Sequence, residues 1–197
     1  MKKANYLATP LFAFALALSL LLSSTAAISA ETEEQLVQQA KQRIAQFAQE
    51  LKGELSAAIQ NGGLQAGVEV CHEKAPQIAE KLSNDGWLLA RTSLRSRNSN
   101  NAPNDWEREV MQQFAQRKAQ GAEISSLVTT NLSENQFRLM KAIPTEGLCL
   151  SCHGSTIAPA VQKQLDLYYP NDMATGFSLG DIRGAFTLTK HLNLEQK

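Results

Sequence analysis

The chain has 197 residues, and its 19 Lys and Arg balance its 19 Asp and Glu, so the formal net charge at pH 7 is zero. This balance argues against a nucleic-acid-binding protein, which needs a basic face. The sequence has three cysteines and three histidines, and its length suits one domain with a full hydrophobic core rather than two.

Residues 1–30 have the pattern of a secretory signal peptide. Two lysines near the start precede an apolar run at residues 11–22, and small residues then lead into a polar segment. The apolar run has about 12 residues, whereas a transmembrane helix needs about 20. We therefore predict cleavage after Ala30, or after Ala27, and export to the periplasm, with a permanent membrane anchor as the alternative. The mature protein would be a single domain at residues 31–197 with no membrane span.

A long amphipathic helix is predicted at the start of the mature chain. Apolar residues recur every three or four positions from Leu36 to Ile59, and Asn61-Gly62-Gly63 marks the stop. A second helical segment runs from Leu64 towards Lys74, where Pro76 either kinks the chain or opens a new helix.

Cys71 and His72 lie on this second helical segment. Cys71 shares a stripe with Val68 and Ala75, whereas His72 is rotated from it by about 100° and leans towards two glutamates on the wetter side. We therefore expect Cys71 to be the residue that points inwards.

The remainder of the chain combines strand patterns with two shorter helices. Alternating side chains indicate the strands, while a capping box at Asn104 and Glu107 and a proline at position 159 indicate the helix starts. The predicted elements are a strand at 87–97, a helix from Asn104 to Gly121, strands at 124–131 and 136–143, a short helix from Pro159 to Tyr168 and a last strand at 182–189. N-terminal helices packed on a small antiparallel sheet place the fold in the α+β class.

The pentapeptide Cys149-Leu150-Ser151-Cys152-His153 has the CxxCH spacing at which a c-type haem is attached. The two thiols can each add to a haem vinyl group, and His153 lies one helical turn from Cys149, from where it can bind the iron. Attachment in c-type cytochromes is completed outside the cytoplasm, which agrees with export. We expect one covalently bound haem c per chain, held by Cys149 and Cys152, with His153 as an iron ligand.

The second axial ligand of the iron separates an electron carrier from a ligand-binding or redox-responsive centre. Cys71 is the odd cysteine of an exported protein, and it is either a buried thiol, half of an intermolecular disulfide or a ligand. A thiolate ligand would favour ferric iron and form a bond that is sensitive to protonation and redox state. The alternatives are an open position and five other side chains: His72, Met111, Met140, Met173 and His191.

Arg91, Arg95 and Arg97 share one face of the strand predicted at residues 87–97. A haem carries two propionate carboxylates, and guanidinium groups suit them. The three arginines are therefore candidates for binding the propionates, with a solvated strand face as the alternative.

Four segments carry a family resemblance: Val70–Pro76, the run from Arg91 to Glu107, Cys149–Gly154 and Gly180–Phe186. Together they resemble a family of exported c-type haem domains of formerly unknown function. That family is known from a cyanobacterial haem protein and from sensor regions of bacterial signalling proteins, and the match covers most of residues 35–190. The resemblance implies a PAS-like fold in which His153 is the proximal iron ligand and Cys71 binds the other side.

We therefore predict a periplasmic haem protein that senses redox state or a small diatomic ligand through loss or exchange of the Cys71 bond, with a periplasmic redox or signalling protein as partner. An electron-transfer c-type cytochrome is the main alternative. A zinc site of Cys71, His72, Cys149 and Cys152 would leave His153 unexplained, and a redox dithiol lacks the thioredoxin-like context. No hydrolase, metalloprotease or phosphate-loop motif is present, so we do not expect an enzyme.

Overall fold

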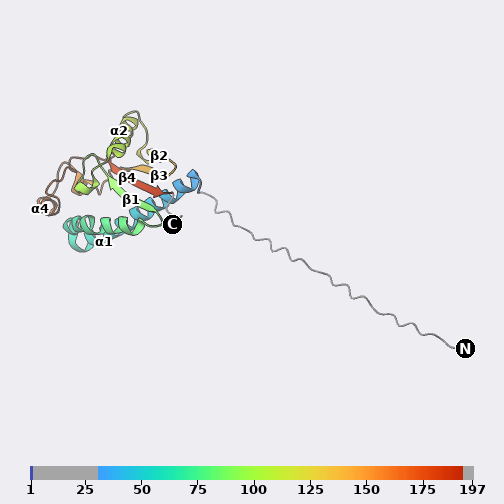
Figure 1. Ribbon diagram of the computed structural model, residues 1–197. Helices are drawn as coiled ribbons and strands as arrows, with labels where there is room; N and C mark the ends of the chain where they lie inside the picture. The colour runs from blue at the N-terminus through green and yellow to red at the C-terminus, as the bar shows by residue number, and fades with distance from the viewer. Residues whose placement is uncertain (2–30, 193–197) are drawn as a thin grey trace. The chain divides into compact units, whose positions relative to one another are not determined.

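The computed structural model describes Met1 and residues 31–192, and residues 31–192 belong to one compact unit. The predicted signal peptide lies outside the described residues. The helices and strands labelled in Figure 1, together with the short α3, are α1 (Glu33–Leu82), β1 (Trp87–Thr92), α2 (Asp105–Ala119), β2 (Val128–Leu132), β3 (Gln136–Pro144), α3 (Leu150–His153), α4 (Pro159–Tyr168) and β4 (Ile182–His191). Short 3-10 turns at Ser99–Asn101 and Ile124–Ser126 precede α2 and β2.

The four strands form one antiparallel sheet in the order β1-β4-β3-β2. Leu188 on β4 lies opposite Leu89 on β1 and Leu139 on β3, so β4 is a central strand. The register shifts between Ile143 and Pro144, where β3 ends and the chain turns towards α3. A long N-terminal helix packed on this sheet confirms the predicted α+β class.

α1 is a helical hairpin rather than a straight rod. Gly63 has φ 72° and ψ −171°, which reverses the chain and confirms the stop predicted at Asn61-Gly62-Gly63. The two halves lie side by side, since Lys81 Nζ is 3.0 Å from Glu50 Oε2. Pro76 opens no new helix, because Gly63 is the one residue of α1 with non-helical dihedral angles.

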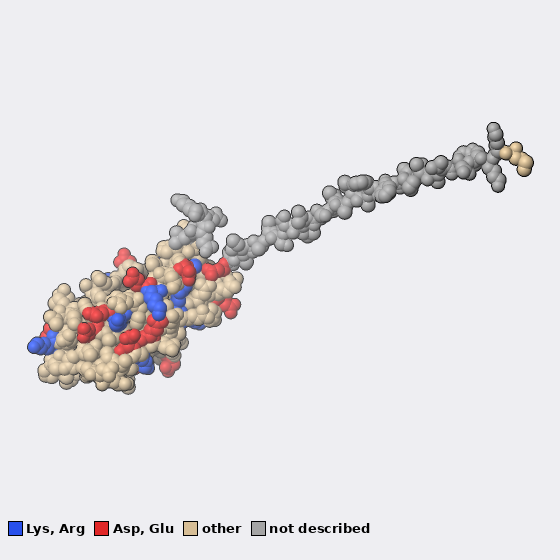
Figure 2. All heavy atoms as spheres, turned by 90° about the horizontal axis from the view of Figure 1, so that it is seen from below, with Lys and Arg blue, Asp and Glu red and all other residues tan. Residues whose placement is uncertain are grey.

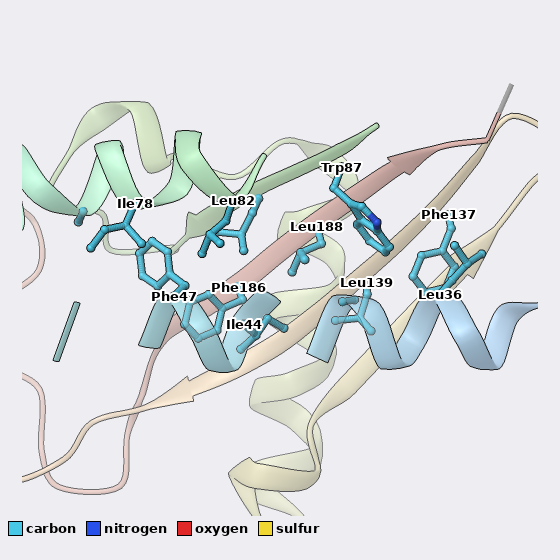
Figure 3. Packing of buried hydrophobic residues seen from close by; sticks show 13 residues of the cluster. Leu36, Ile44, Phe47, Ile78, Leu82, Trp87, Phe137, Leu139, Phe186 and Leu188 are labelled. Carbon is cyan, nitrogen blue, oxygen red and sulfur yellow. The ribbon is translucent and has the colours of Figure 1, made fainter. Parts of the chain in front are cut away.

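The sheet is covered by α1 on one face and by α2 on the other (Figure 1). The α1 face forms the larger core, and Figure 3 labels its bulky members: Leu36, Ile44, Phe47, Ile78, Leu82, Trp87, Phe137, Leu139, Phe186 and Leu188. On the α2 face, Val110 and Phe114 pack with Met140 of β3. Because side chains alternate along a strand, the neighbours Leu139 and Met140 serve opposite faces.

α2 begins with the predicted capping box. The Glu107 N–H donates to Asn104 Oδ1, and the Asn104 N–H donates to the Glu107 carboxylate, each at 3.0 Å. This reciprocal pair satisfies backbone N–H groups that the start of a helix otherwise leaves without partners.

Two predicted strand boundaries are wrong. β1 ends at Thr92, because the Ser93 N–H donates to the Asn101 carbonyl instead of continuing the ladder. The strand predicted at 124–131 begins only at Val128, after a 3-10 turn. Both differences shorten strands at the two edges of the sheet.

The described part of the chain contains no helix with both the length and the apolar character needed to cross a bilayer. On the face shown in Figure 2, acidic and basic side chains are interspersed. Positive and negative side chains therefore alternate on this face and do not form two separate regions.

Candidate functional site

A cavity of about 530 Å³ lies among the α1 hairpin, the sheet and the segment around α3. Leu51, Leu55 and Ile59 line it at helical spacing, and each is only half-buried. They continue the apolar stripe whose earlier members, Leu36 and Ile44, are buried in the core. The stripe therefore changes along α1 from core to cavity wall, and the cavity has the size of a cofactor site, about 300–1,000 Å³.

The predicted attachment motif forms a short helical turn on the cavity wall. The His153 N–H donates to the Cys149 carbonyl at 2.8 Å, so the two residues lie one turn apart as predicted. Cys149, Cys152 and His153 all line the cavity. The Glu146 N–H donates to Cys149 Sγ at 3.4 Å, which helps to fix the start of this turn.

The His153 ring is held through one of its two nitrogens. Nδ1 donates to the Ala174 carbonyl at 2.7 Å, and the ring meets Phe177 edge-on with centroids 6.3 Å apart. Burial, together with the nearby guanidinium groups of Arg183 and Arg97, lowers the pKa of His153 to about 2. The imidazole is therefore neutral at physiological pH, and its Nε2 carries a free lone pair.

Cys71 lines the same cavity from the second half of α1, as the helical periodicity predicted. Burial raises the pKa of its thiol, and Arg91 is the strongest of the nearby cations that oppose this rise. The fold therefore brings Cys71 of α1 and His153 of α3 to one cavity.

His72 is half-buried rather than open to solvent, although the neighbouring Glu69 and Glu73 are exposed as predicted. Its ring stacks on Tyr168 with centroids 4.5 Å apart and meets Tyr169 edge-on at 5.4 Å, so the end of α4 covers it. Its Nδ1 is buried and has no hydrogen-bond partner among the described residues. His72 does not line the cavity, and nowhere in residues 31–192 do three His, Cys, Asp or Glu side chains gather as a metal site, so the zinc alternative gains no support.

The four remaining ligand candidates lie away from the cavity. Met111 and Met140 are buried in the cluster between α2 and the sheet. Met173 is 56% exposed, and His191 is exposed at the end of β4. Among the six side chains considered, Cys71 is the one that lines the cavity with the CxxCH motif.

Three guanidinium groups line the cavity, but they are not the three predicted. Arg91 and Arg97 line it, whereas Arg95 is exposed and does not. The predicted common face fails because β1 ends before Arg95. Arg183, at the start of β4, lines the cavity instead. Arg183 reaches the cavity because β4 pairs with β1. The segment Gly180–Phe186 carried part of the family resemblance, but the sequence did not single out Arg183 as a cavity residue.

Tyr169 is a second cavity residue that the sequence did not single out. Its side chain is buried directly after α4, and Arg97 lies over its ring at 6.0 Å. Burial, with a smaller contribution from Cys71, raises the pKa of Tyr169 to about 12. No local pattern distinguishes this tyrosine from its neighbour Tyr168.

Arg97 ties the attachment motif to the segment after α4. Its Nε is 3.0 Å from Asp172 Oδ2, and its Nη2 donates to the carbonyls of Cys152 and Ala174. The two side chains of this ion pair are only 8% and 9% exposed. Asp172 Oδ1 also accepts a hydrogen bond from the Ala174 N–H at 2.7 Å. A buried ion pair therefore holds the carbonyl that orients His153.

Residues 24–190 match the sequence profile of the Tll0287-like family, named for Tll0287. A solved crystal structure, that of the cyanobacterial heme-protein Tll0287, has a similar fold, with a TM-score of 0.63 and 23% sequence identity. The similarity covers 85% of this chain and 100% of that chain. No curated protein matches the sequence. The family match includes every residue that lines the cavity.

Proposed function

Because this chain belongs to the Tll0287-like family, we propose that it is an exported, periplasmic c-type haem protein that senses redox state or a small diatomic ligand. Cys149 and Cys152 would hold one haem c covalently, with His153 and Cys71 as axial ligands. The haem supplies a redox-active iron centre with an adjustable ligand set. The domain would be a PAS-like variant of the α+β class, with a periplasmic redox or signalling protein as partner and no enzymatic step.

One observation carries the proposal: a cofactor-sized cavity is lined by both cysteines and the histidine of CxxCH and by the third cysteine, Cys71. The donor set fits haem iron. A metal-binding histidine usually donates its other ring N–H to a carbonyl or carboxylate, as His153 does to Ala174. Its low pKa keeps the imidazole in the neutral form that a metal requires.

Cys71 is the group through which sensing would act. The strength of thiolate ligation varies with protonation and redox state. Burial raises the pKa of the Cys71 thiol by more than Arg91, Arg97 and Arg183 lower it, so the thiol favours its neutral form when no metal binds it. The sensor role depends on release of Cys71 when the centre is reduced or when a diatomic ligand competes for its position.

The haem-loaded protein, matured in the periplasm, provides the test. Wild type should give a c-type pyridine haemochrome and a low-spin ferric EPR signal typical of thiolate ligation. Cys71→Ala should change both the optical and the EPR spectrum, whereas Met173→Ala, which alters an exposed side chain, should change neither. Wild-type spectra in Cys71→Ala would exclude ligation by Cys71. A colourless wild-type protein with free thiols at Cys149 and Cys152 would exclude the haem.

Export has a separate test. N-terminal sequencing of the haem-loaded protein should begin at Glu31, or at Ile28 if cleavage follows Ala27. The protein should be recovered with the periplasmic fraction. A haem-loaded product that retains Met1 would contradict cleavage.

An electron-transfer c-type cytochrome is the second candidate function. It is favoured by the presence of two protein groups, His153 and Cys71, for the two axial positions, because a carrier needs no vacant position. Spectra that do not respond to CO or NO in either redox state, with fast electron exchange with a periplasmic partner, would identify a carrier. A spectral response to CO or NO that is enhanced in Cys71→Ala would instead support the sensor.

A further inference from the structure

The cavity holds more positive charge than the described residues neutralise. Arg91, Arg97 and Arg183 all line it. Arg97 is compensated by its ion pair with Asp172. Within residues 31–192, neither Arg91 nor Arg183 forms an ion pair. Two cationic side chains on the cavity wall are therefore left without a carboxylate partner from the described residues.

Arg91 projects from the α1 face of β1. The alternation of the strand puts it on the same side as Trp87 and Leu89, both of which are buried. Its guanidinium carbon lies 5.1 Å from the centroid of the Phe47 ring, and its side chain makes no hydrogen bond with any described residue. Burial lowers the pKa of Arg91, with Cys71 the strongest opposing influence. An aromatic face is thus the main compensation for this charge.

Arg183 is only partly satisfied. Its Nη1 donates to Ser93 Oγ at 3.4 Å and to the Arg95 carbonyl at 3.5 Å, and both distances are long for hydrogen bonds. Its Nε is buried and has no partner among the described residues. Burial, with the repulsion of Arg97 and Arg91, lowers the pKa of Arg183 to about 10. This guanidinium therefore retains an N–H donor for which residues 31–192 supply no acceptor.

The groups around these two arginines come from several walls of the cavity. Asp172, the carboxylate among them, is already paired with Arg97, and Glu146 at the cavity is exposed and paired with Lys52 at 3.7 Å. The charged or titratable neighbours that act on Arg91 or Arg183 are Cys71, Arg97, Cys149, Tyr169 and Asp172. No carboxylate among residues 31–192 is therefore free to neutralise Arg91 and Arg183.

A partly buried cation without a counter-ion is unfavourable, and a guanidinium group can bind a carboxylate through two parallel hydrogen bonds. We propose that Arg91 and Arg183 form a two-arginine site for the two propionate carboxylates of the haem. The number of uncompensated guanidinium groups matches the number of these carboxylates. The inference rests on the proposed function. The sequence named Arg91, Arg95 and Arg97 as candidates for binding the propionates; the structure keeps Arg91 and puts Arg183 in place of the other two.

The test measures the ionisation of the propionates in haem-loaded Arg91→Gln and Arg183→Gln, with Arg95→Gln as the matched control. The reduction potential is followed from pH 4 to pH 9 by spectroelectrochemistry, and carboxylate bands are followed by redox-difference infrared spectroscopy. In wild type, paired guanidinium groups should keep both propionates ionised, so the potential should show no propionate inflection above about pH 5.

Each glutamine variant should raise the propionate pKa by about one to three units, which moves an inflection of the potential into the measured range and shifts the carboxylate bands. Arg91→Lys and Arg183→Lys retain the positive charge and should raise the propionate pKa less than the glutamine variants do. Arg95→Gln should behave as wild type. A propionate inflection near neutral pH in wild type, or glutamine variants with wild-type profiles and bands, would overturn the inference. A colourless wild-type protein would instead overturn the proposed function, so the two failures are distinguishable.

Discussion

Arg97, Asp172 and Ala174 form a small network that sets the direction of the His153 ring. The Ala174 carbonyl accepts hydrogen bonds from both His153 Nδ1, at 2.7 Å, and Arg97 Nη2, at 3.3 Å. Asp172 holds the other side of this network through Arg97 Nε and the Ala174 N–H. Hydrogen bonds to charged groups are stronger than those between neutral groups, so the carbonyl that accepts from the ring is itself held firmly in place.

Removal of Arg97 should therefore be costly. Arg97→Gln leaves the Asp172 carboxylate buried without its cation, and we expect the free energy of unfolding to fall by about 3–5 kcal/mol. Urea titration of the haem-loaded protein, followed by far-UV circular dichroism, measures this change. Lys52→Gln is the control, because its pair with Glu146 is 70% and 63% exposed and should contribute at most about 1 kcal/mol. An equal loss of unfolding free energy in the two variants would contradict a stabilising role of the buried Arg97–Asp172 ion pair.

Asp181 should contribute to the acid sensitivity of the fold. The Ser178 N–H donates to its Oδ2 at 2.8 Å and Lys118 Nζ donates to its Oδ1 at 3.1 Å, and these bonds lower the pKa of Asp181. A carboxyl whose pKa is lower in the folded state stabilises the fold above its unfolded pKa, about 3.9, and loses this effect as the pH falls through the folded value. Asp181→Asn should flatten the loss of unfolding free energy between about pH 5 and pH 3. Urea titrations across this range measure the unfolding free energy. An equal loss per pH unit in wild type and in Asp181→Asn would contradict the role assigned to Asp181.

Among the elements, α1 does most to position the site, and its reversal at Gly63 is the local cause. The first half supplies Leu51, Leu55 and Ile59 to the cavity, and the returning half supplies Cys71. The dihedral angles of Gly63, φ 72° and ψ −171°, lie in a region that glycine alone adopts without strain. One backbone position therefore brings two helical stripes to the same cavity.

Two glycines of α1 should respond to alanine with opposite signs. Gly63→Ala should lower the free energy of unfolding by about 1–3 kcal/mol, because an alanine is strained at this φ and its Cβ would lie 3.2 Å from Gln65 Oε1. Gly53→Ala should raise it by about 0.5–1 kcal/mol, because residue 53 is helical and a Cβ there meets nothing within 4 Å. Thermal and urea unfolding of both variants check the signs. Destabilisation by Gly53→Ala, or none by Gly63→Ala, would contradict this account of the hairpin.

The elements that the sequence predicted well are those with local causes. The start of α2 follows from Asn104 and Glu107, three residues apart, and the reversal in α1 follows from Gly62-Gly63. The end of β1 has a distant cause, since the Ser93 N–H pairs with the Asn101 carbonyl. Alternation alone therefore predicted a strand that was too long.

The residues of the candidate site also fall into those that local sequence patterns predict and those that depend on distant contacts. The turn from Cys149 to His153 is set by a spacing of four residues, and the inward orientation of Cys71 follows from the helical period. The environment of His72 depends on its cover by α4, and the role of Arg183 depends on the position of β4 beside β1. These two arise from tertiary contacts between segments about 90 residues apart, which no local pattern encodes.

At the scale of the whole domain, the two faces of the sheet differ in their relation to the cavity. The α1 face continues into the cavity, and Phe47 belongs both to its core and to the cavity wall. The α2 face forms a separate cluster in which Phe114 is fully buried and does not line that cavity. Stability and cofactor environment should therefore be separable by substitutions on opposite faces.

Phe114→Ala and Phe47→Ala test this division. Both remove a buried phenyl ring, so each should lower the free energy of unfolding by about 3–5 kcal/mol. Only Phe47→Ala should also change the optical spectrum and the pH profile of the reduction potential, because the ring lies 5.1 Å from the Arg91 guanidinium and 5.5 Å from Phe186. Urea titration and spectroelectrochemistry of the haem-loaded variants separate the two effects. If Phe114→Ala shifted the spectrum as much as Phe47→Ala, the α2 face would be coupled to the cavity, and the sheet could not be treated as a partition between core and site.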